Sequence, residues 1–396
     1  MSKKFFNHFT YKHTITACFV GFIVQAIVNN YVPLLFLTFH STYGIPMSKI
    51  TLLITFNFCV QLIVDLLSAG FIDKIGYRTS MILAHILSSG GLILLAILPE
   101  VLPDAFWGLL LPVMIYAIGG GLLEVLVSPI VEACPTDNKE TAMSLLHSFY
   151  CWGHVGVVLL STLFFVFFGT QNWKILAVLW AVIPAVNGLF FTKVPIYSLL
   201  DEDAPAISLK ELFVNKSFWL LFLSMICTGA SEQAISQWAS TFAEAGLKVS
   251  KTVGDLAGPM FFALLMGISR AFYGKYGEQI DLKRFMKASS SLCICSYLMI
   301  SLAPLPILSL LGCGICGLSV GILWPGSFST ASRVISRGGT TLFALLALGG
   351  DIGCSAGPTF AGIISSIAGG NLHIGILAAI LFPVLMLIIC FMLRKS

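Results

Sequence analysis

The segment VGVVLLSTLFFVFF, residues 155–168, is a continuous run of apolar side chains with two hydroxyl residues in its middle. Inside a lipid bilayer every backbone N–H and C=O must be bonded within the protein, and an α-helix does this within one segment. A membrane β-barrel would instead show alternating apolar and polar residues over about ten positions. The run does not alternate, so it predicts a membrane-spanning helix.

The run belongs to one of twelve apolar segments of the same character. They lie near residues 14–39, 50–72, 79–98, 106–131, 141–168, 173–192, 217–242, 253–274, 284–303, 306–330, 340–368 and 371–393. A spanning helix needs about 20 residues, so the chain can supply about a dozen with short loops. The first segment is longer than a signal-peptide core and shows no small-residue cleavage site, so we expect it to be retained. These patterns predict an all-α membrane protein with twelve transmembrane helices.

The composition excludes several other classes of protein. The chain is 57% hydrophobic and 10% charged, whereas soluble domains carry about 25% charged residues. A net charge of +4 over 396 residues provides no basic stripe for nucleic acid. The cysteines lie in apolar runs, which argues against a disulfide framework. Cys313 and Cys316 are spaced as CxxC, but no second pair completes a metal site, so we predict neither a metal nor a cofactor.

The basic residues predict the orientation in the membrane. Most of the 22 Lys and Arg residues fall in loops on the same side as the N-terminus. Short cytoplasmic loops carry such an excess, so we expect both termini to face the cytoplasm of a cell membrane.

The chain reads as two halves. A polar linker, 193–216, separates residues 1–192 from residues 217–396, and each half holds six predicted spans. GFIVQAIVNN (21–30) aligns with GASEQAISQW (229–238), and TAMSLLHSFYCWG (141–153) aligns with TLFALLALGGDIG (341–353). In both halves a glycine precedes a proline by eight residues, Gly121 before Pro129 and Gly317 before Pro325. These matches predict a duplicated six-helix bundle, an arrangement that alternating-access transporters use around a midplane site.

The loop AGFIDKIGYR (69–78) resembles the signature loop of the major facilitator superfamily, with Ala69 in place of the usual glycine and Tyr77 in place of a common second basic residue. GGGLLEVLVSP (119–129), GISRAFYGKYG (267–277), ILWPGSF (322–328) and LALGGDIGCSAGPTFAGIISSIAG (346–369) resemble its fucose:proton symporter branch and the sodium-coupled glucose relatives. The resemblance implies a transporter with a major facilitator fold.

We expect the residues of the signature loop to act in gating. Gly76 permits a tight turn, and Asp73, Lys74 and Arg78 can pair with helix ends or with the opposite bundle. The two basic residues also enforce topology. Asp65 belongs either to this latch or to a buried coupling site, and its cytoplasmic depth favours the latch.

Glu124 is the clearest candidate for ion coupling. An acid at the membrane centre costs about 2.5 to 3.5 kcal/mol and usually lines a cavity. The resemblance implies that Glu124 couples protons and contacts sugar, and the alternative is a structural hydrogen bond to a neighbouring helix. Where the fucose branch carries an Asp after an Asn in the first span, this chain has Asn29 and Asn30. Sodium coupling or uncoupled transport therefore stays open, and Glu232 could supply a substitute acid.

Arg270 matches an arginine typical of the fucose branch, and we expect it to pair with Glu132 or Asp351 and to fasten one conformation. Asp351 occupies the repeat position of Cys151 and is an alternative cation ligand. His147, Cys151 and His154 share one helical stripe, which could mark a proton path or a metal pair; interhelical hydrogen bonds are the expected role.

Side-chain amides suit a polyol because they both donate and accept hydrogen bonds. Gln25 and Asn29 share one helical face, as do Gln233 and Gln237. Amide bonds between helices are the alternative, and Trp324 could equally be a packing residue. We predict that the substrate is bound by Gln25, Asn29, Asn30, Glu124, Gln233, Gln237, Trp238 and Trp324.

The sequence thus predicts a monomeric secondary active transporter of a small hydrophilic solute, a sugar, coupled to a proton or sodium ion. A drug or metabolite exporter of the same superfamily is the alternative. A membrane sensor would need a cytoplasmic module larger than the linker. An enzyme would need a nucleophile and base within reach, and no such pattern stands out in the sequence.

Overall fold

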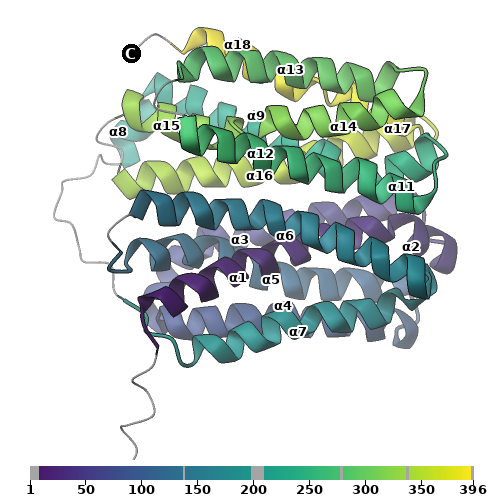
Figure 1. The fold of residues 1–396 in the computed structure, drawn as a ribbon, viewed down its shortest axis with the longest axis horizontal. Coiled ribbons are helices and arrows are strands. Elements are labelled where there is room, and N and C mark those ends of the chain that lie inside the picture. Colours follow the sequence, from purple (N-terminus) through teal and green to yellow (C-terminus); the bar gives the residue numbers. More distant parts are fainter. Residues whose placement is uncertain (1–8, 137–138, 198–208, 277–279, 336–338, 394–396) are drawn as a thin grey trace, which may run out of the picture. The chain divides into compact units, whose positions relative to one another are not determined.

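The computed structural model describes residues 9–136, 139–197, 209–276, 280–335 and 339–393, and every regular element in these ranges is a helix (Figure 1). Contacts divide the chain into two units. Unit 1 is Met1–Gly44 with Val60–Glu202, and unit 2 is Ile45–Cys59 with Asp203–Ser396. One boundary falls within the predicted linker 193–216. Residues 45–59, expected in the N-terminal bundle, are grouped with unit 2.

Unit 1 contains the second half of α3 and the helices before and after it. Its elements are α1 (Tyr11–Asn30), η1 (Val32–Leu35), α2 (Phe36–Tyr43), α3 (Met47–Ile75), α4 (Tyr77–Val101), α5 (Ala105–Glu132), α6 (Lys139–Phe168), η2 (Thr170–Asn172) and α7 (Trp173–Phe191). Helix α4 packs against α5 and α7, and α1 packs against α5, α6 and α7. Helix α1 is therefore central among the described helices of this unit.

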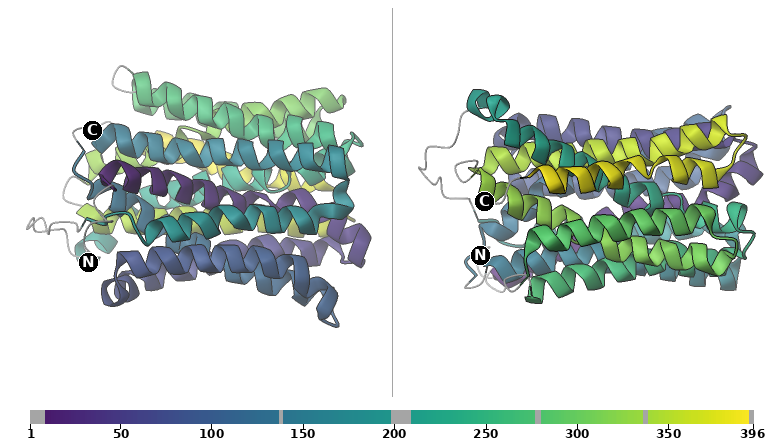
Figure 2. Two further views of the ribbon diagram at one scale, coloured as in Figure 1. Left: turned by 60° about the horizontal axis from the view of Figure 1, so that its bottom comes forward. Right: turned by 90° about the horizontal axis from the view of Figure 1, so that it is seen from above.

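Unit 2 repeats this plan with more interruptions. Its elements are α8 (Leu209–Val214), α9 (Lys216–Ser236), α10 (Ala239–Thr241), η3 (Phe242–Gly246), α11 (Lys251–Asp255), η4 (Leu256–Met260), α12 (Phe261–Tyr276), α13 (Leu282–Leu302), α14 (Pro306–Val320), α15 (Leu323–Val334), α16 (Gly339–Ile367), α17 (Leu372–Ala378) and α18 (Leu381–Met392). Helix α9 packs against α16, α18, α15 and α14, as α1 does against its neighbours in unit 1. Figure 2 shows the helices from two further sides.

Helix α3 is continuous but its two halves belong to different units. In the first half, Oγ1 of Thr55 lies 2.5 Å from Oγ1 of Thr359 on α16. Sγ of Cys59 lies 3.2 Å from Oγ of Ser355, one turn earlier on α16. These hydroxyl and thiol contacts attach Ile45–Cys59 to α16 and explain its grouping with unit 2.

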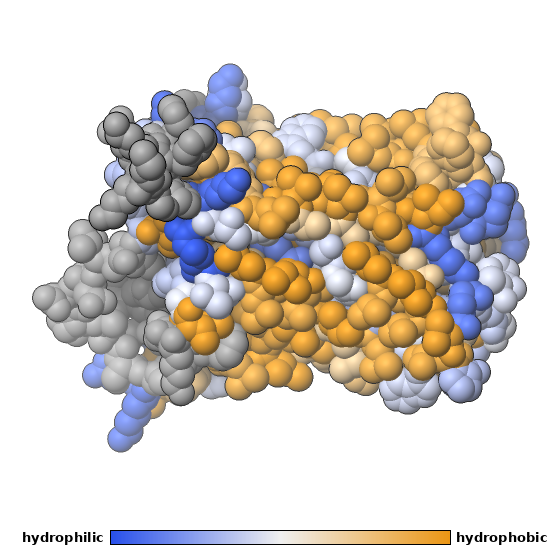
Figure 3. Space-filling view, turned by 90° about the horizontal axis from the view of Figure 1, so that it is seen from below, coloured by the Kyte–Doolittle hydropathy of each residue, from blue (hydrophilic) through white to orange (hydrophobic). Residues whose placement is uncertain are grey.

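The described helices are long and apolar enough for a membrane. Eleven of them qualify as spans by length and hydropathy among the described residues, and the 29-residue helix α16 coincides with the remaining predicted segment, 340–368. Large apolar side chains such as Phe167 and Ile307 are 76% and 72% exposed. Figure 3 shows apolar side chains over the middle of the helices and hydrophilic ones near their ends. The predicted fold class, an all-α multi-pass membrane protein, is confirmed.

Glycines allow two of the helix pairs to approach closely. A Cβ on Gly353 of α16 would lie 2.0 Å from the carbonyl oxygen of Ile226 on α9. A Cβ on Gly317 of α14 would lie 2.0 Å from the carbonyl oxygen of Phe262 on α12. No side chain fits at either position, so the glycine clusters serve close helix packing.

Helix α1 of unit 1 and the corresponding helix α9 of unit 2 are both interrupted. The predicted spans 14–39 and 217–242 were continuous and did not include these breaks. Helix α1 ends at Asn30 and the chain continues as the 3-10 turn η1. Pro33 has no N–H to donate to the carbonyl of Asn29, so the α-helical pattern stops there. Helix α9 ends at Ser236, and after Trp238 the chain continues through α10 into the π-helical turn η3.

Candidate functional site

Three buried amides form a chain of hydrogen bonds in unit 1, just before the break in α1. Nε2 of Gln25 donates to Oε1 of Gln61 at 3.0 Å, and Nε2 of Gln61 donates to Oδ1 of Asn29 at 2.8 Å. All three side chains are at most 6% exposed. Gln61 on α3 thus links the two amides that the sequence placed on one face of α1. Sequence reasoning missed Gln61, although an amide inside an apolar span was a signal.

The amide chain ends at Glu124 on α5. Nε2 of Gln25 also donates to Oε2 of Glu124, at 3.0 Å. A Cβ on Gly120, one turn earlier on α5, would lie 3.2 Å from Oε1 of Gln25 and 3.0 Å from Val28. The glycine therefore leaves room for the Gln25 amide beside α5. The structure brings together Gln25, Asn29 and Glu124, three of the residues predicted to bind substrate.

Asp65 on α3 lies beside the same carboxyl group. The carboxylate oxygens of Asp65 and Glu124 are within 4.8 Å of each other. At that separation two negative charges repel each other by about 3.5 kcal/mol if the effective dielectric constant is about 20. This position favours the buried coupling site over the cytoplasmic latch that the sequence analysis preferred for Asp65.

Asn30 belongs to a different set of contacts. Its Nδ2 donates to the carbonyl oxygen of Ala26 at 2.9 Å and lies 3.4 Å from the hydroxyl oxygen of Tyr150 on α6. The side chain is 3% exposed. Asn30 therefore donates to a backbone carbonyl of its own helix next to the break. Its role in substrate binding stays a prediction.

In unit 2 the corresponding stretch of α9 carries an ion pair as well as amides. Nη2 of Arg270 on α12 lies 3.3 Å from Oε2 of Glu232. Nε2 of Gln233 donates to Oε1 of Glu232 at 3.3 Å, and Nε2 of Gln237 donates to Oε1 of Gln233 at 3.0 Å. The two amides predicted from the repeat lie together, and they lead to an acid as those of unit 1 do.

Arg270 forms an ion pair with Glu232, an acid that was not among its expected partners Glu132 and Asp351; pairing with those two stays a prediction. The side chains of Arg270 and Glu232 are 16% and 7% exposed. Glu232 had been considered as a substitute coupling acid, and the ion pair places the guanidinium of Arg270 beside it. The side chain of Glu132 lies outside the described residues. Asp351 on α16 is buried.

The two tryptophans predicted to line the substrate site both pack against α16. Nε1 of Trp238 donates to the carbonyl oxygen of Pro358 at 2.9 Å, and its side chain is 1% exposed. A Cβ on Gly350 would lie 2.2 Å from the ring of Trp324. Each ring thus occupies space that the backbone of α16 leaves free, which is the packing role considered for Trp324.

The loop between α3 and α4 makes the turn expected of it. Gly76 has a φ of +81° at the start of α4, a conformation that favours glycine. Nη1 and Nη2 of Arg78 donate to the carbonyl oxygens of Phe191 and Val194, at 2.6 and 2.8 Å, just after α7. Arg78 therefore pairs with a helix end, one of the roles predicted for it. The side chains of Asp73 and Lys74 lie outside the described residues.

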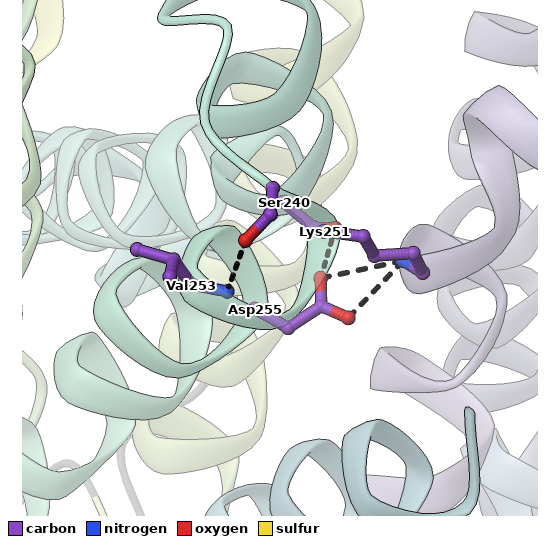
Figure 4. A network of polar contacts seen from close by, with 5 residues as sticks. Ser240, Lys251, Val253 and Asp255 are labelled. Atoms are coloured by element: carbon purple, nitrogen blue, oxygen red, sulfur yellow. Dashed lines mark hydrogen bonds and ion pairs between the residues drawn. The ribbon is translucent and has the colours of Figure 1, made fainter. Parts of the chain in front are cut away.

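A polar network in unit 2 escaped the sequence analysis. The Asp255 side chain on α11 is fully buried. It accepts a hydrogen bond from Oγ of Ser240 on α10, and Oδ2 lies 3.1 Å from Nζ of Lys251 (Figure 4). The network joins the two short helices that follow the break in α9. Its signal was the spacing of four residues between Lys251 and Asp255.

Two histidines of the predicted stripe lie on α6. The ring of His147 lies 5.4 Å from that of Phe22, and His154 is 2% exposed. The roles considered for the stripe stay predictions.

The comparisons with known proteins agree on one family. The model of the Major Facilitator Superfamily matches residues 17–358. No curated protein sequence matches the chain.

Several solved structures share the fold. A bacterial homologue of the human lysosomal transporter Spinster superposes with a TM-score of 0.78 at 14% identity, covering 98% of each chain. A nucleoside transporter has a TM-score of 0.76 at 13% identity, covering 97% of this chain and 100% of its own. The E. coli fucose:proton symporter has a TM-score of 0.66 at 15% identity, covering 98% of this chain and 100% of its own. The helical fold, the duplicated breaks and the family match lead to one conclusion: the chain belongs to the Major Facilitator Superfamily of membrane transporters.

Proposed function

We propose that this transporter carries a sugar or a closely related polyol by alternating access, and that a cation moves with the solute. The observation that carries the proposal is the buried chain of amides in unit 1, which runs from Asn29 through Gln61 and Gln25 to Glu124. Buried polar groups are costly in a membrane helix and mark substrate or ion pathways.

The amides have the chemistry that a polyol requires. Each side-chain amide offers two donors and an acceptor, so it can both donate hydrogen bonds to solute hydroxyl groups and accept hydrogen bonds from them. Unit 2 supplies a second pair, Gln233 and Gln237, from the equivalent helix. Hydrogen bonds between helices already use part of this donor and acceptor capacity, which is the role that the alternative interpretation gives to the amides. A helix break follows each set of amides. It frees backbone N–H and C=O groups that an uninterrupted helix would use for its own hydrogen bonds.

Two proteins of similar fold support a hydroxyl-rich solute. One is described as a fucose:proton symporter and the other as a nucleoside transporter. Both solutes named in those descriptions carry several hydroxyl groups, which favours a polyol over the apolar cargo of a drug exporter. We further propose that the chain works as a monomer in the cell membrane with both termini in the cytoplasm, as the loop charges predict.

The test is solute counterflow in proteoliposomes containing the purified full chain. A panel of unlabelled monosaccharides and nucleosides is loaded inside, and entry of the labelled compound is followed. We expect saturable counterflow of at least one monosaccharide. Counterflow of apolar drugs with none of any sugar would overturn the proposal in favour of an exporter.

Substituting the buried amides tests whether they bind the solute. Gln25→Ala and Gln233→Ala should each weaken the apparent affinity for the solute by about tenfold, because each leaves solute hydroxyls unpaired at a cost of about 1 to 3 kcal/mol. The control is Gln171→Ala, since Gln171 is an exposed amide of unit 1 in η2. Equal affinities in all three variants would place the solute elsewhere.

A further inference from the structure

Helices α1 and α7 form a groove on unit 1 that the proposed transport function does not use. The groove has a volume of about 530 Å³, within the range of about 300 to 1,000 Å³ that ligand pockets have. Phe9 and Val20 line it from the side of α1, and Val182, Val186 and Phe190 line it from α7. Most of its lining is therefore apolar, and such a surface fits a hydrocarbon chain.

The apolar wall on α7 leads to a cation. Val182, Val186 and Phe190 are four residues apart and share one face of the helix. Lys193 follows in the next turn, where its backbone N–H donates to the carbonyl oxygen of Phe190 at 2.9 Å. Among the described residues that line the groove, Lys193 is the one that carries a charge. Its side chain is exposed, so it can reach an anionic group at the end of the groove.

The length of this wall matches one leaflet of a bilayer. Val182 is in the middle of α7, and the path from it to Lys193 rises about 16 Å at 1.5 Å per residue. One leaflet contributes about 15 Å of hydrocarbon. Oγ1 of Thr14 donates to the carbonyl oxygen of Pro195 at 2.6 Å, so Lys193 lies at the same end of unit 1 as the start of α1. The groove thus runs from the membrane interior to the headgroups on the side where we place the N-terminus.

Hydrogen bonds between the helices fix the floor of the groove. Asn187 lines it and is 3% exposed. Its Nδ2 donates to the carbonyl oxygen of Ala17 on α1 at 3.0 Å and lies 2.8 Å from Nε2 of His85 on α4. Together with the bond of Thr14, these contacts hold α1 and α7 at a set spacing. The groove is therefore a preformed surface of packed helices.

The end of α7 is electrostatically suited to an anion. The last carbonyls of a helix carry a partial negative charge, which by itself repels anions. Nη1 and Nη2 of Arg78 donate to the carbonyl oxygens of Phe191 and Val194, which flank Lys193. The guanidinium charge offsets that of the helix end, so the attraction of Lys193 for an anion is not cancelled there.

We propose that the groove between α1 and α7 binds one anionic phospholipid, with an acyl chain along Val182 and Val186 and the phosphate beside Lys193. Burial of the chain supplies affinity, and the lysine supplies the headgroup preference. A zwitterionic lipid would bring its ammonium group close to Lys193, and the two positive charges repel each other. The site shares no residue with the buried amides proposed to bind the solute, so it stands independently of the solute's identity.

Native mass spectrometry of the purified full chain in detergent tests the headgroup preference. The protein is titrated with phosphatidylglycerol, phosphatidylcholine or oleate. We expect a saturable phosphatidylglycerol site with about fivefold higher affinity than for phosphatidylcholine, which corresponds to the about 1 kcal/mol that one lysine near the headgroups contributes. Lys193→Gln should remove the preference. Lys210→Gln is the control and should retain it, because it removes the same charge from an exposed lysine of unit 2.

Val186→Trp tests the acyl-chain part of the site by filling the groove. Val186 is 60% exposed, so the larger side chain does not disturb the core. Affinity for both phospholipids should fall by about tenfold, the loss expected when about 60 Å² of apolar contact is displaced. Val178→Trp is the matched control, because Val178 is 43% exposed on the same helix and is not part of the lining. Gel filtration and thermal unfolding verify that each variant is folded.

Three results would overturn the proposal. One is equal affinity of the unsubstituted protein for the two phospholipids, and another is a preference that persists in Lys193→Gln. Unchanged affinity in Val186→Trp would place the lipid elsewhere on the protein. Binding of oleate as tight as that of phosphatidylglycerol, and lost in Lys193→Gln, would make the ligand a free fatty acid and the phospholipid assignment wrong.

Discussion

Nε2 of Gln25 lies 3.0 Å from Oε2 of Glu124, and this contact joins the first helix of unit 1 to the acid of α5. The same amide group donates to Gln61. A change in the charge or position of Glu124 therefore directly alters the hydrogen bonds of the amides proposed to bind the solute. The contact offers a physical route for coupling between ion and solute, because both would compete for or share the same amide group.

Glu124→Gln should abolish uphill transport and spare solute exchange. The substituted amide keeps the shape and an acceptor for Gln25, but it carries no charge with which to bind a cation. Uphill uptake driven by a cation gradient and counterflow without a gradient are measured in the same proteoliposomes. Unchanged accumulation by Glu124→Gln would remove this acid from the coupling mechanism.

Breaking the Glu232–Arg270 pair from one side should strongly destabilise unit 2. Both side chains are largely buried, and leaving one charge without its partner in such a place costs about 3 to 5 kcal/mol. Glu232→Gln should lower the thermal unfolding temperature, and the double variant Glu232→Gln with Arg270→Leu should recover a large part of the loss.

The exposed pair of Arg284 and Asp281 is the control for that experiment. Its side chains are 85% and 53% exposed, so Arg284→Ala should change stability by about 0 to 1 kcal/mol. If the double variant of the buried pair is no more stable than Glu232→Gln alone, the two residues do not act as a pair.

Arg78→Lys should weaken the attachment of α4 to the end of α7 while keeping the membrane topology. The guanidinium donates to the carbonyl oxygens of Phe191 and Val194, and an ammonium group cannot reproduce this fork. Losing one charged hydrogen bond costs about 1.5 to 3 kcal/mol. Thermal unfolding reports the stability, and labelling of introduced loop cysteines reports the topology. A variant as stable as the unsubstituted chain would leave Arg78 with a topological role alone.

Gly353→Ala should impair folding more than the same substitution at a glycine with open space around it. The new Cβ would lie 2.0 Å from the carbonyl oxygen of Ile226, and forcing a methyl group into a filled interface costs about 1 to 3 kcal/mol. Gly156→Ala on α6 is the matched control, because its Cβ would meet no atom within 4 Å. The helix propensity of alanine should make that variant neutral or slightly more stable. Similar unfolding temperatures for the two variants would contradict the close contact of α9 and α16.

The length of the helices was predictable, and their interruptions were not. The span predicted near 106–131 is α5, Ala105–Glu132, because a long apolar run in a membrane leaves the backbone no other partner. The predicted span 306–330 is instead divided between α14 and α15 after Val320. A break depends on which neighbouring groups can satisfy the freed backbone, and hydropathy carries no information about them.

For the candidate site, too, part could be predicted from the sequence and part could not. The repeat pattern singled out Gln25 with Asn29 and Gln233 with Gln237, because residues four apart share a helical face whatever the helix packs against. The link through Gln61 depends on a second helix, and the sequence analysis did not include it. The contact of Arg270 with Glu232 was not predicted for a similar reason: several acids were available in the sequence, and helix packing brings this one within 3.3 Å.

The amino-acid sequence by itself determined that this protein is a bundle of membrane helices with a duplicated plan. The helices follow from the length of the apolar runs, and the duplication follows from residues that match between the two halves of the chain. Tertiary structure alone decided that Asp65 faces Glu124, that Gln61 bridges two amides of α1, and that Arg270 meets Glu232. Each of these relations joins side chains from different helices. Their distances depend on where the glycines let the backbones touch, which no local pattern specifies.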